Sequence, residues 1–225
     1  MPELVQQLPD GPIDFIGDVH GELEALQRLL AHLGYRPDGS HAAGRHLVFL
    51  GDLVDRGPDS PAVALLVREL VGNHHASCIL GNHEMNAMLG KKRTYNRWLG
   101  HHEGMSGPLE QAPQQVATND ERVKILNFFR TLPVVLEHNV LRVVHACWDD
   151  RAVEVLRQAG PDADVVSCLR VADDALRRAK LVGASDPCAK ANLNPIRRLL
   201  CGPEIPAFEG ASRQTVRTPW WETDH

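Results

Sequence analysis

Three short polar segments, each placed directly after an apolar run, limit the fold of this chain more than any other feature. Short apolar runs bounded by turn residues are typical of buried strands. In an open α/β sheet, ligands bind beyond the carboxyl ends of the strands, so we expect the polar side chains of these segments to share one rim. The apolar runs are Ile13 to Ile16, Leu47 to Leu50 and Cys78 to Leu80, and the segments after them are Gly17-Asp18-Val19-His20-Gly21, Gly51-Asp52-Leu53-Val54-Asp55-Arg56-Gly57 and Gly81-Asn82-His83-Glu84.

A helix is predicted after each of these segments. Glu22 to Leu33 carries leucines at helical spacing and ends before Gly34. Ser60 and Pro61 open a second helix, with the serine as its cap and the proline at its first position. Glu84 to Leu89 begins a third helix. The repeated order of strand, polar segment and helix predicts parallel β-α units up to residue 90.

The remainder of the chain predicts a loop-rich insertion followed by helices and a hairpin. Residues 90–120 lack apolar periodicity, and we expect a solvated insertion in which His101 and His102 are exposed. The length of 225 residues is compatible with one large domain spanning residues 1–225. The other predicted elements are a helix at Glu121 to Thr131, a hairpin of Val134 to Glu137 and Val140 to Val144 that turns at His138-Asn139, helices at Arg151 to Ala159, Ala163 to Leu181 and Pro187 to Leu200, and a strand at Arg213 to Thr218.

The residue types at the predicted rim favour a centre for two divalent metal ions. Such a pair neutralises phosphoryl oxygens and activates a water molecule for phosphate-ester hydrolysis. Asp18 and His20 lie two residues apart, so both can face one side of an extended chain, and we assign them to the first ion. Asp52 is placed to give one oxygen to each ion. Asn82 and His145, which ends a further predicted strand, complete most of the second site.

Three neighbouring residues are candidates for catalysis. His83 follows the predicted ligand Asn82 and is the candidate general acid. Asp55 can accept a hydrogen bond from the His83 imidazole, which orients the ring and favours its protonated form. Arg56 offers a planar fork suited to two phosphate oxygens. Each of these residues alone would most often be structural, and it is their occurrence in order after apolar strands that indicates a site.

The order and wording of these segments resemble the calcineurin-like metallophosphoesterases, and in particular the bacterial branch similar to phosphoprotein phosphatases. Val143-Val144-His145-Ala146 resembles a fourth segment of that family. The resemblance implies an α/β fold in which two mixed β-sheets are sandwiched between helices, in four layers. It also implies hydrolysis of phosphate monoesters, as in serine/threonine phosphatases, by a hydroxide that bridges two metal ions. The ligand types fit manganese first, with iron or zinc as alternatives.

One part of the family pattern is missing from this sequence. Family members supply a further histidine to the second metal, within a Gly-His segment after the last strands. Between His145 and the end of the chain, the only histidine is His225. We expect that the chain ends before this segment, since substitution by a terminal His225 is disfavoured by fraying. With fewer protein ligands, the second ion is expected to bind more weakly than the first.

Composition limits the classes of binding partner and the cellular compartment that we expect for this protein. The net charge of -5 disfavours nucleic-acid binding, which usually needs a basic face. No run of eighteen apolar residues is present, so no membrane span is expected. The five cysteines are scattered singly, which is typical of reduced thiols in a cytoplasmic protein.

Three functions remain open at this stage. The first is a phosphatase that acts on a phosphorylated protein or on a small phosphoester. The second is a dinucleoside polyphosphate hydrolase, whose motifs are similar. The third is a non-catalytic binding module that has kept the fold with an incomplete second metal site.

Overall fold

The computed structural model describes residues 3–100, 113–160, 163–179, 188–207 and 215–218. The chain forms two compact units. We call Gln7–Leu132 the N-terminal unit, and Met1–Gln6 with Pro133–His225 the C-terminal unit. The predicted exposure of His101 and His102 and the predicted role of His225 lie outside the described residues.

The N-terminal unit contains a three-stranded parallel sheet, as the sequence predicts. Its strands are β2 (Ile13–Ile16), β3 (His46–Phe49) and β4 (Ala76–Cys78), in the order β2-β3-β4. Ile16 is paired with Phe49, and Phe49 with Cys78, so the three strands end at the same edge. The central strand β3 is buried at Leu47, Val48 and Phe49. The edge strand β2 is less buried than expected, because Phe15 remains 42% exposed.

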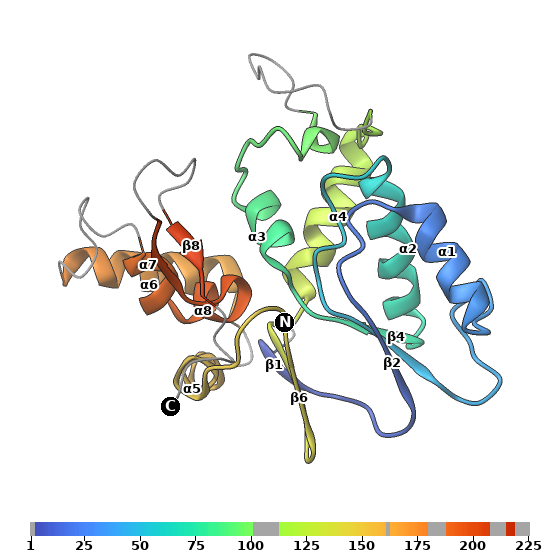
Figure 1. Ribbon diagram of the computed structural model, residues 1–225, viewed down its shortest axis with the longest axis horizontal. Coiled ribbons are helices and arrows are strands. Elements are labelled where there is room, and N and C mark those ends of the chain that lie inside the picture. Colours follow the sequence, from blue (N-terminus) through green and yellow to red (C-terminus); the bar gives the residue numbers. More distant parts are fainter. Residues whose placement is uncertain (1–2, 101–112, 161–162, 180–187, 208–214, 219–225) are drawn as a thin grey trace. The chain divides into compact units, whose positions relative to one another are not determined.

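The helices of the N-terminal unit pack on one another and on the sheet. Helix α2 lies between α1 and α4 and also contacts β4, while α3 packs against α4 (Figure 1). Leu26 and Leu30 form the buried face of α1, and Ile125, Phe128 and Phe129 form that of α4. The bounds are α1 (Leu23–His32), α2 (Ser60–Gly72), α3 (Asn82–Met88), α4 (Asn119–Thr131) and the short 3-10 helix η1 (Arg97–Leu99).

The cap of α2 differs from the prediction. Asp59, not Ser60, caps this helix, and its carboxylate accepts a hydrogen bond from the backbone N–H of Ala62. Ser60 is the first helical residue, and its hydroxyl oxygen accepts a hydrogen bond from the backbone N–H of Asp55 at 2.8 Å. Both residue types favour caps, and here the serine hydroxyl is used instead to hold a motif loop.

The described part of residues 90–120 is exposed at many positions, but a few of its residues are buried. Trp98 is fully buried, and Asn96, Leu99 and Ala117 are also buried. Asn96 accepts a hydrogen bond from the backbone N–H of Arg93 and donates one to the carbonyl of Lys91. These bonds satisfy backbone groups within the loop itself, which allows an aperiodic segment to pack against the sheet rim.

The C-terminal unit contains the predicted hairpin. Strands β5 (Val135–His138) and β6 (Leu141–Val144) are antiparallel, and β1 (Val5–Gln7) joins them in the order β1-β5-β6. His138 pairs with Leu141, so the turn lies at residues 139–140, one residue later than expected. A second antiparallel pair consists of β7 (Glu204–Pro206), which was not predicted, and β8 (Thr215–Arg217), which was.

The helices of the C-terminal unit are α5 (Asp150–Gln158), α6 (Val165–Arg178), α7 (Ala189–Leu193) and α8 (Pro195–Cys201). The prediction of a single helix over residues 187–200 is therefore wrong. Pro195 has no N–H donor and disfavours helical geometry at Asn194, so one helix ends and another begins there. The side chain of Asn194 caps α8 by accepting hydrogen bonds from the N–H groups of Ile196 and Arg197.

The α/β class is confirmed, with parallel strands in one sheet and antiparallel pairs in the others. Among the described helices, none combines the length and the apolar character that crossing a membrane requires.

Candidate active site at the carboxyl end of the parallel sheet

The first two motif loops are joined by backbone hydrogen bonds. The carbonyl of Asp52 accepts from the N–H groups of Val19 at 3.1 Å and His20 at 2.9 Å. The carbonyl of His20 in turn accepts from the N–H of Gly57 at 2.8 Å. These bonds follow directly from the parallel pairing of β2 with β3, because both loops leave the sheet at the same edge. The loops therefore form one rigid rim.

Glu84 fastens the third motif to the second. Its side chain is fully buried. One carboxylate oxygen accepts from the backbone N–H groups of Asp52 at 2.8 Å and Gly81 at 3.0 Å, and the other accepts from Leu53 at 2.8 Å. A buried carboxylate is stable when several donors satisfy it. The sequence predicts Glu84 only as the start of a helix, but an acidic residue directly after Asn82-His83 is also a candidate support for the loop.

The backbone of the rim adopts unusual conformations. His20, Asp52, Asp55 and Arg56 have φ values of 47°, 50°, 76° and 68°, in the left-handed region that non-glycine residues rarely occupy. Gly81 lies so close to Asp52 that a Cβ atom there would overlap both its carboxylate and its backbone nitrogen. Such conformations cost free energy and persist only where the surroundings enforce them, as they often do at functional sites.

His20 presents an unpaired nitrogen to two carboxylates. Its Nδ1–H donates to the carbonyl of Val54 at 2.9 Å, so Nε2 carries the free lone pair. Nε2 lies 3.5 Å from Asp18 Oδ2 and 3.9 Å from Asp52 Oδ2. It is buried and has no hydrogen-bond partner among the described residues. An imidazole oriented through its other nitrogen and facing two carboxylates is the arrangement of a metal ligand, so these residues fit a divalent cation.

His83 is a second histidine beside Asp52. Its Nε2 is 3.8 Å from Asp52 Oδ2, and its backbone N–H donates to Asp52 Oδ1 at 3.0 Å. The rings of His83 and His20 meet edge to face, with centroids 4.7 Å apart. Ligand-type atoms of His20, Asp52 and His83 all lie within 4.8 Å of one another. The first three predicted metal ligands and the predicted acid are therefore neighbours.

Asp55 is a buried partner of His83. Its Oδ2 accepts from His83 Nδ1 at 2.7 Å, and its Oδ1 accepts from Trp98 Nε1 at 2.6 Å. Burial lowers the pKa of His83, but the hydrogen bond that His83 donates to Asp55 and the charge of Asp52 outweigh this, and the pKa is raised. The ring therefore holds its proton more strongly than a free imidazole does. Trp98 was missed by the sequence analysis, because nothing in a polar, aperiodic stretch links it to a residue 43 positions earlier.

Tyr95 and Arg56 complete the described rim. The carbonyl of Tyr95 accepts from the backbone N–H of Arg56 at 2.9 Å and from the side chain of Gln114 at 2.9 Å. The ring of Tyr95 packs against His83, with centroids 5.1 Å apart. The guanidinium of Arg56 is exposed, as a phosphate-binding role requires. Tyr95 was also missed.

Asn82 and His145 are the other two predicted ligands. Asn82 is half-buried and is the first residue of α3, directly before His83. His145 directly follows β6 in the C-terminal unit. Their assignment to a second ion stays a prediction from the sequence.

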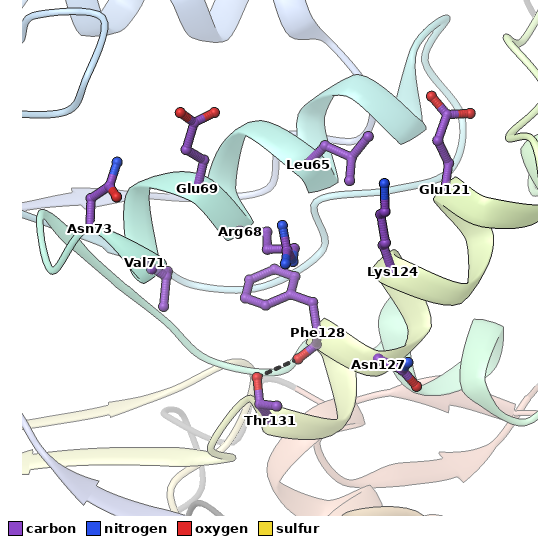
Figure 2. Close-up of a pocket in the computed structure, with 11 residues that line it drawn as sticks. Leu65, Arg68, Glu69, Val71, Asn73, Glu121, Lys124, Asn127, Phe128 and Thr131 are labelled. Atoms are coloured by element: carbon purple, nitrogen blue, oxygen red, sulfur yellow. Dashed lines mark hydrogen bonds between the residues drawn. The ribbon is translucent and has the colours of Figure 1, made fainter.

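A separate cleft of about 1030 Å³ lies between α2 and α4 in the N-terminal unit (Figure 2). Leu65, Val71 and Phe128 give it an apolar lining. Its charged lining residues are two basic ones, Arg68 and Lys124, and two acidic ones, Glu69 and Glu121. No motif residue lines it, so this cleft is distinct from the candidate active site.

Several proteins with assigned names are similar to this chain. The bis(5'-nucleosyl)-tetraphosphatase PrpE [asymmetrical] of Oceanobacillus iheyensis is 53% identical over 74 residues, which cover 32% of this chain and 30% of that protein. The protein of the same name from Halalkalibacterium halodurans is 35% identical over 124 residues, covering 53% and 48%. A symmetrical bis(5'-nucleosyl)-tetraphosphatase of Tolumonas auensis is 30% identical over 130 residues, covering 58% and 41%. The chain thus spans about half or less of the length of these relatives.

A solved structure and a family model agree on the fold. A protein serine/threonine phosphatase from Saccharomyces cerevisiae matches with a TM-score of 0.50 and 19% identity, covering 72% of this chain and 49% of that one. At this identity the match speaks for the fold alone. The model of the calcineurin-like phosphoesterase family matches residues 11–182, which include all the motif residues described above. The chain belongs to the calcineurin-like phosphoesterase family.

Proposed function

We propose that this protein is a metal-dependent hydrolase that cleaves a phosphoanhydride bond in dinucleoside polyphosphates. The observation that carries the hydrolase assignment is the unpaired His20 Nε2, which faces the carboxylates of Asp18 and Asp52 beside the His83–Asp55 pair. The choice of substrate is supported by the relatives, which are named tetraphosphatases. The phosphoprotein phosphatase predicted first uses the same chemistry but has no comparable support among these relatives.

The metal ions would be held by residues of the rim. Asp18, His20 and Asp52 would hold one divalent ion, and Asp52 with Asn82 and His145 would hold a second, manganese being the first candidate. When bound, such ions neutralise the phosphoryl oxygens and make water a stronger nucleophile. We also propose that both compact units belong to one phosphoesterase domain, since the matched family region includes residues of each.

His83 would donate the proton to the leaving group. Water supplies the oxygen of the new P–O bond and releases one proton to the solvent. The bond from phosphorus to the leaving oxygen breaks, and the proton of His83 Nε2 passes to that oxygen. Asp55 holds Nδ1 at 2.7 Å, which directs Nε2 toward Asp52 and the metal-ligand side. Trp98 fixes Asp55 through its second oxygen. Proton transfer by a positioned histidine contributes about 10²- to 10⁴-fold to such rates.

Arg56 would bind the phosphate chain. Its backbone is held in a left-handed conformation by the bond from its N–H to Tyr95, and its side chain is exposed. A guanidinium can donate two parallel hydrogen bonds to phosphate oxygens, which orients the scissile bond.

The test compares three substrates with the complete chain and manganese. We expect diadenosine tetraphosphate to be hydrolysed with a higher kcat/KM than a phosphoserine peptide or para-nitrophenyl phosphate. Asp52→Asn should abolish turnover of all three. A preference for the phosphopeptide would overturn the substrate assignment and restore the phosphatase. An absence of turnover with every substrate and excess metal would favour the non-catalytic binding module.

A further inference from the structure

Tyr95 carries an open hydrogen-bond donor beside the proposed proton donor. Its side chain is half-buried. Its ring packs at 5.1 Å from the ring of His83, at an angle of 46°. Among the described residues, the hydroxyl takes part in no hydrogen bond. Tyrosine hydroxyls that are partly removed from water usually find a partner, so a ligand oxygen could satisfy this one.

The backbone around Tyr95 holds this side chain in place. Its carbonyl accepts hydrogen bonds from both Arg56 and Gln114. The next residue, Asn96, is buried and ties the loop together through Lys91 and Arg93. Tyr95 is therefore not a mobile surface residue. It stands on a fixed loop whose backbone is bonded directly to that of Arg56, so the two residues are neighbours at the rim.

The position of Tyr95 places it on the leaving-group side of the proposed reaction. A general acid must lie within hydrogen-bond reach of the leaving oxygen. A group packed on His83 is thus close to whatever is attached to that oxygen. In a phosphoanhydride this is a second phosphorus with charged, non-bridging oxygens. In a phosphate monoester it is a carbon atom, which accepts no hydrogen bond.

We infer that Tyr95 is a specificity-determining residue whose hydroxyl, together with the Arg56 guanidinium, binds the phosphate of the leaving group and so favours phosphoanhydrides over phosphate monoesters. This inference rests on the proposed function and adds the structural reason for its substrate class. Two donors next to the leaving group would distinguish an anhydride from an ester, because only the anhydride has acceptors there. A hydrogen bond to a charged group changes affinity enough to alter substrate choice.

The experiment uses Tyr95→Phe in the complete, manganese-loaded chain. This change removes the hydroxyl and keeps the ring on His83 and the backbone bonds of the loop. We measure kcat/KM with diadenosine tetraphosphate, with inorganic tripolyphosphate and with para-nitrophenyl phosphate. We expect the ratio of either polyphosphate to the aryl ester to fall about tenfold.

The matched control is Tyr35→Phe, the same change at the only other tyrosine of the sequence. The Tyr35 hydroxyl donates to Asp14 at 2.7 Å, away from the motif residues, so this variant should keep the wild-type ratios. An unchanged ratio in Tyr95→Phe would overturn the inference. A parallel loss on all three substrates would also overturn it, because Tyr95 would then act only by positioning His83.

The two proposals fail separately. If the wild-type protein hydrolyses tripolyphosphate but not diadenosine tetraphosphate, the dinucleotide assignment is wrong, and the role of Tyr95 is still judged on tripolyphosphate. If neither polyphosphate is a substrate while the aryl ester is hydrolysed, the preference for phosphoanhydrides is refuted as well.

Discussion

Strand β2 carries one aspartate near its start and leads to another beyond its end, and the two have opposite surroundings. Asp14 accepts from the hydroxyl of Tyr35 at 2.7 Å and from Arg45 Nε at 2.6 Å. Asp18 is 53% exposed, and 3.5 Å away lies the His20 Nε2 that has no hydrogen-bond partner in the described chain. The first carboxylate is saturated by permanent donors and stabilises the fold. The carboxylate of Asp18 lies exposed next to the free lone pair of His20 Nε2, and this pair of ligand atoms suits a cation.

The same contrast recurs within the rim itself. Glu84 and Asp55 are fully buried and bonded to several donors. These saturated anions fix the loops that carry His20, Asp52 and His83. The buried anions Glu84 and Asp55 therefore stabilise the loops, and the side chains of His20, Asp52 and His83 remain available for a cation or a substrate. Four substitutions test this division, from the largest expected effect to the smallest.

Asp52→Asn should remove the open site with little effect on the fold. The amide oxygen can still accept the bond from the His83 N–H, but the charge that a metal ion needs is lost. We expect kcat/KM for diadenosine tetraphosphate to fall about a thousandfold, with a nearly unchanged melting temperature. Asp14→Asn is the control and should keep activity. Substantial activity in Asp52→Asn would contradict the role of this carboxylate.

Glu84→Gln should unfold the rim, because an amide NH₂ group would face backbone N–H donors. We expect the free energy of unfolding to fall by about 2–3 kcal/mol, measured by urea denaturation. Glu121→Gln is matched, since both glutamates are the third residue of a helix and accept a hydrogen bond from the backbone N–H of the N-cap residue. Glu121 bonds only to Thr118 at an exposed position, and its loss should cost under about 1 kcal/mol. Equal losses in the two variants would show that Glu84 is only a cap.

Trp98→Phe should leave the buried Asp55 with one donor fewer. We expect kcat to fall about tenfold while KM changes little, because His83 is less well oriented. The unfolding free energy should fall by about 1–2 kcal/mol. Trp148→Phe, which removes an exposed bond to Asp150, should alter stability by under about 0.5 kcal/mol. An effect on KM alone would argue against a role of Trp98 in holding the Asp55–His83 pair.

Asp14→Asn should have the smallest effect, and one that depends on pH. The hydrogen bond from Arg45 is the largest influence on the pKa of Asp14 and lowers it from 3.8 to about 2. A lowered pKa in the folded state stabilises the protein above 3.8, and this contribution is lost as the pH falls toward 2. We expect the variant to be less stable by about 1–2 kcal/mol at neutral pH. The difference should vanish in acid, and a difference that persists there would refute the assignment.

The sequence was sufficient to predict the parts of the site that lie next to strand ends. Asp18, Asp52 and His83 each follow an apolar run, and parallel pairing then brings them to one edge. The predicted neighbours His20 and Asp55 follow from the same motifs. This inference works because strand direction and loop length leave few other places for such residues.

The supporting residues could not be predicted in this way. Glu84 bonds to backbone groups 30 to 32 positions earlier, and Trp98 reaches Asp55 across 43 positions. No local pattern records such distances. The helix break before Pro195 was not predicted, for a different reason. Apolar residues on both sides of Pro195 favour one continuous helix, but the missing N–H of the proline ends the first helix. At the start of α2, both Asp59 and Ser60 are suitable cap residues. Asp59 caps the helix, and the Ser60 hydroxyl accepts a hydrogen bond from the N–H of Asp55.

The left-handed residues of the rim have a consequence for any attempt to make this protein more heat-resistant. The left-handed backbone conformation costs about 1–3 kcal/mol per non-glycine residue, and glycine adopts it without this cost. The residues concerned are His20, Asp52, Asp55 and Arg56. A screen that selects only for melting temperature would therefore accept glycine at Arg56, whose side chain is exposed, and would yield a more stable but less active protein. Thermal engineering should begin at His74, which has the same backbone geometry (φ 61°) in a turn after α2 and none of the chemistry.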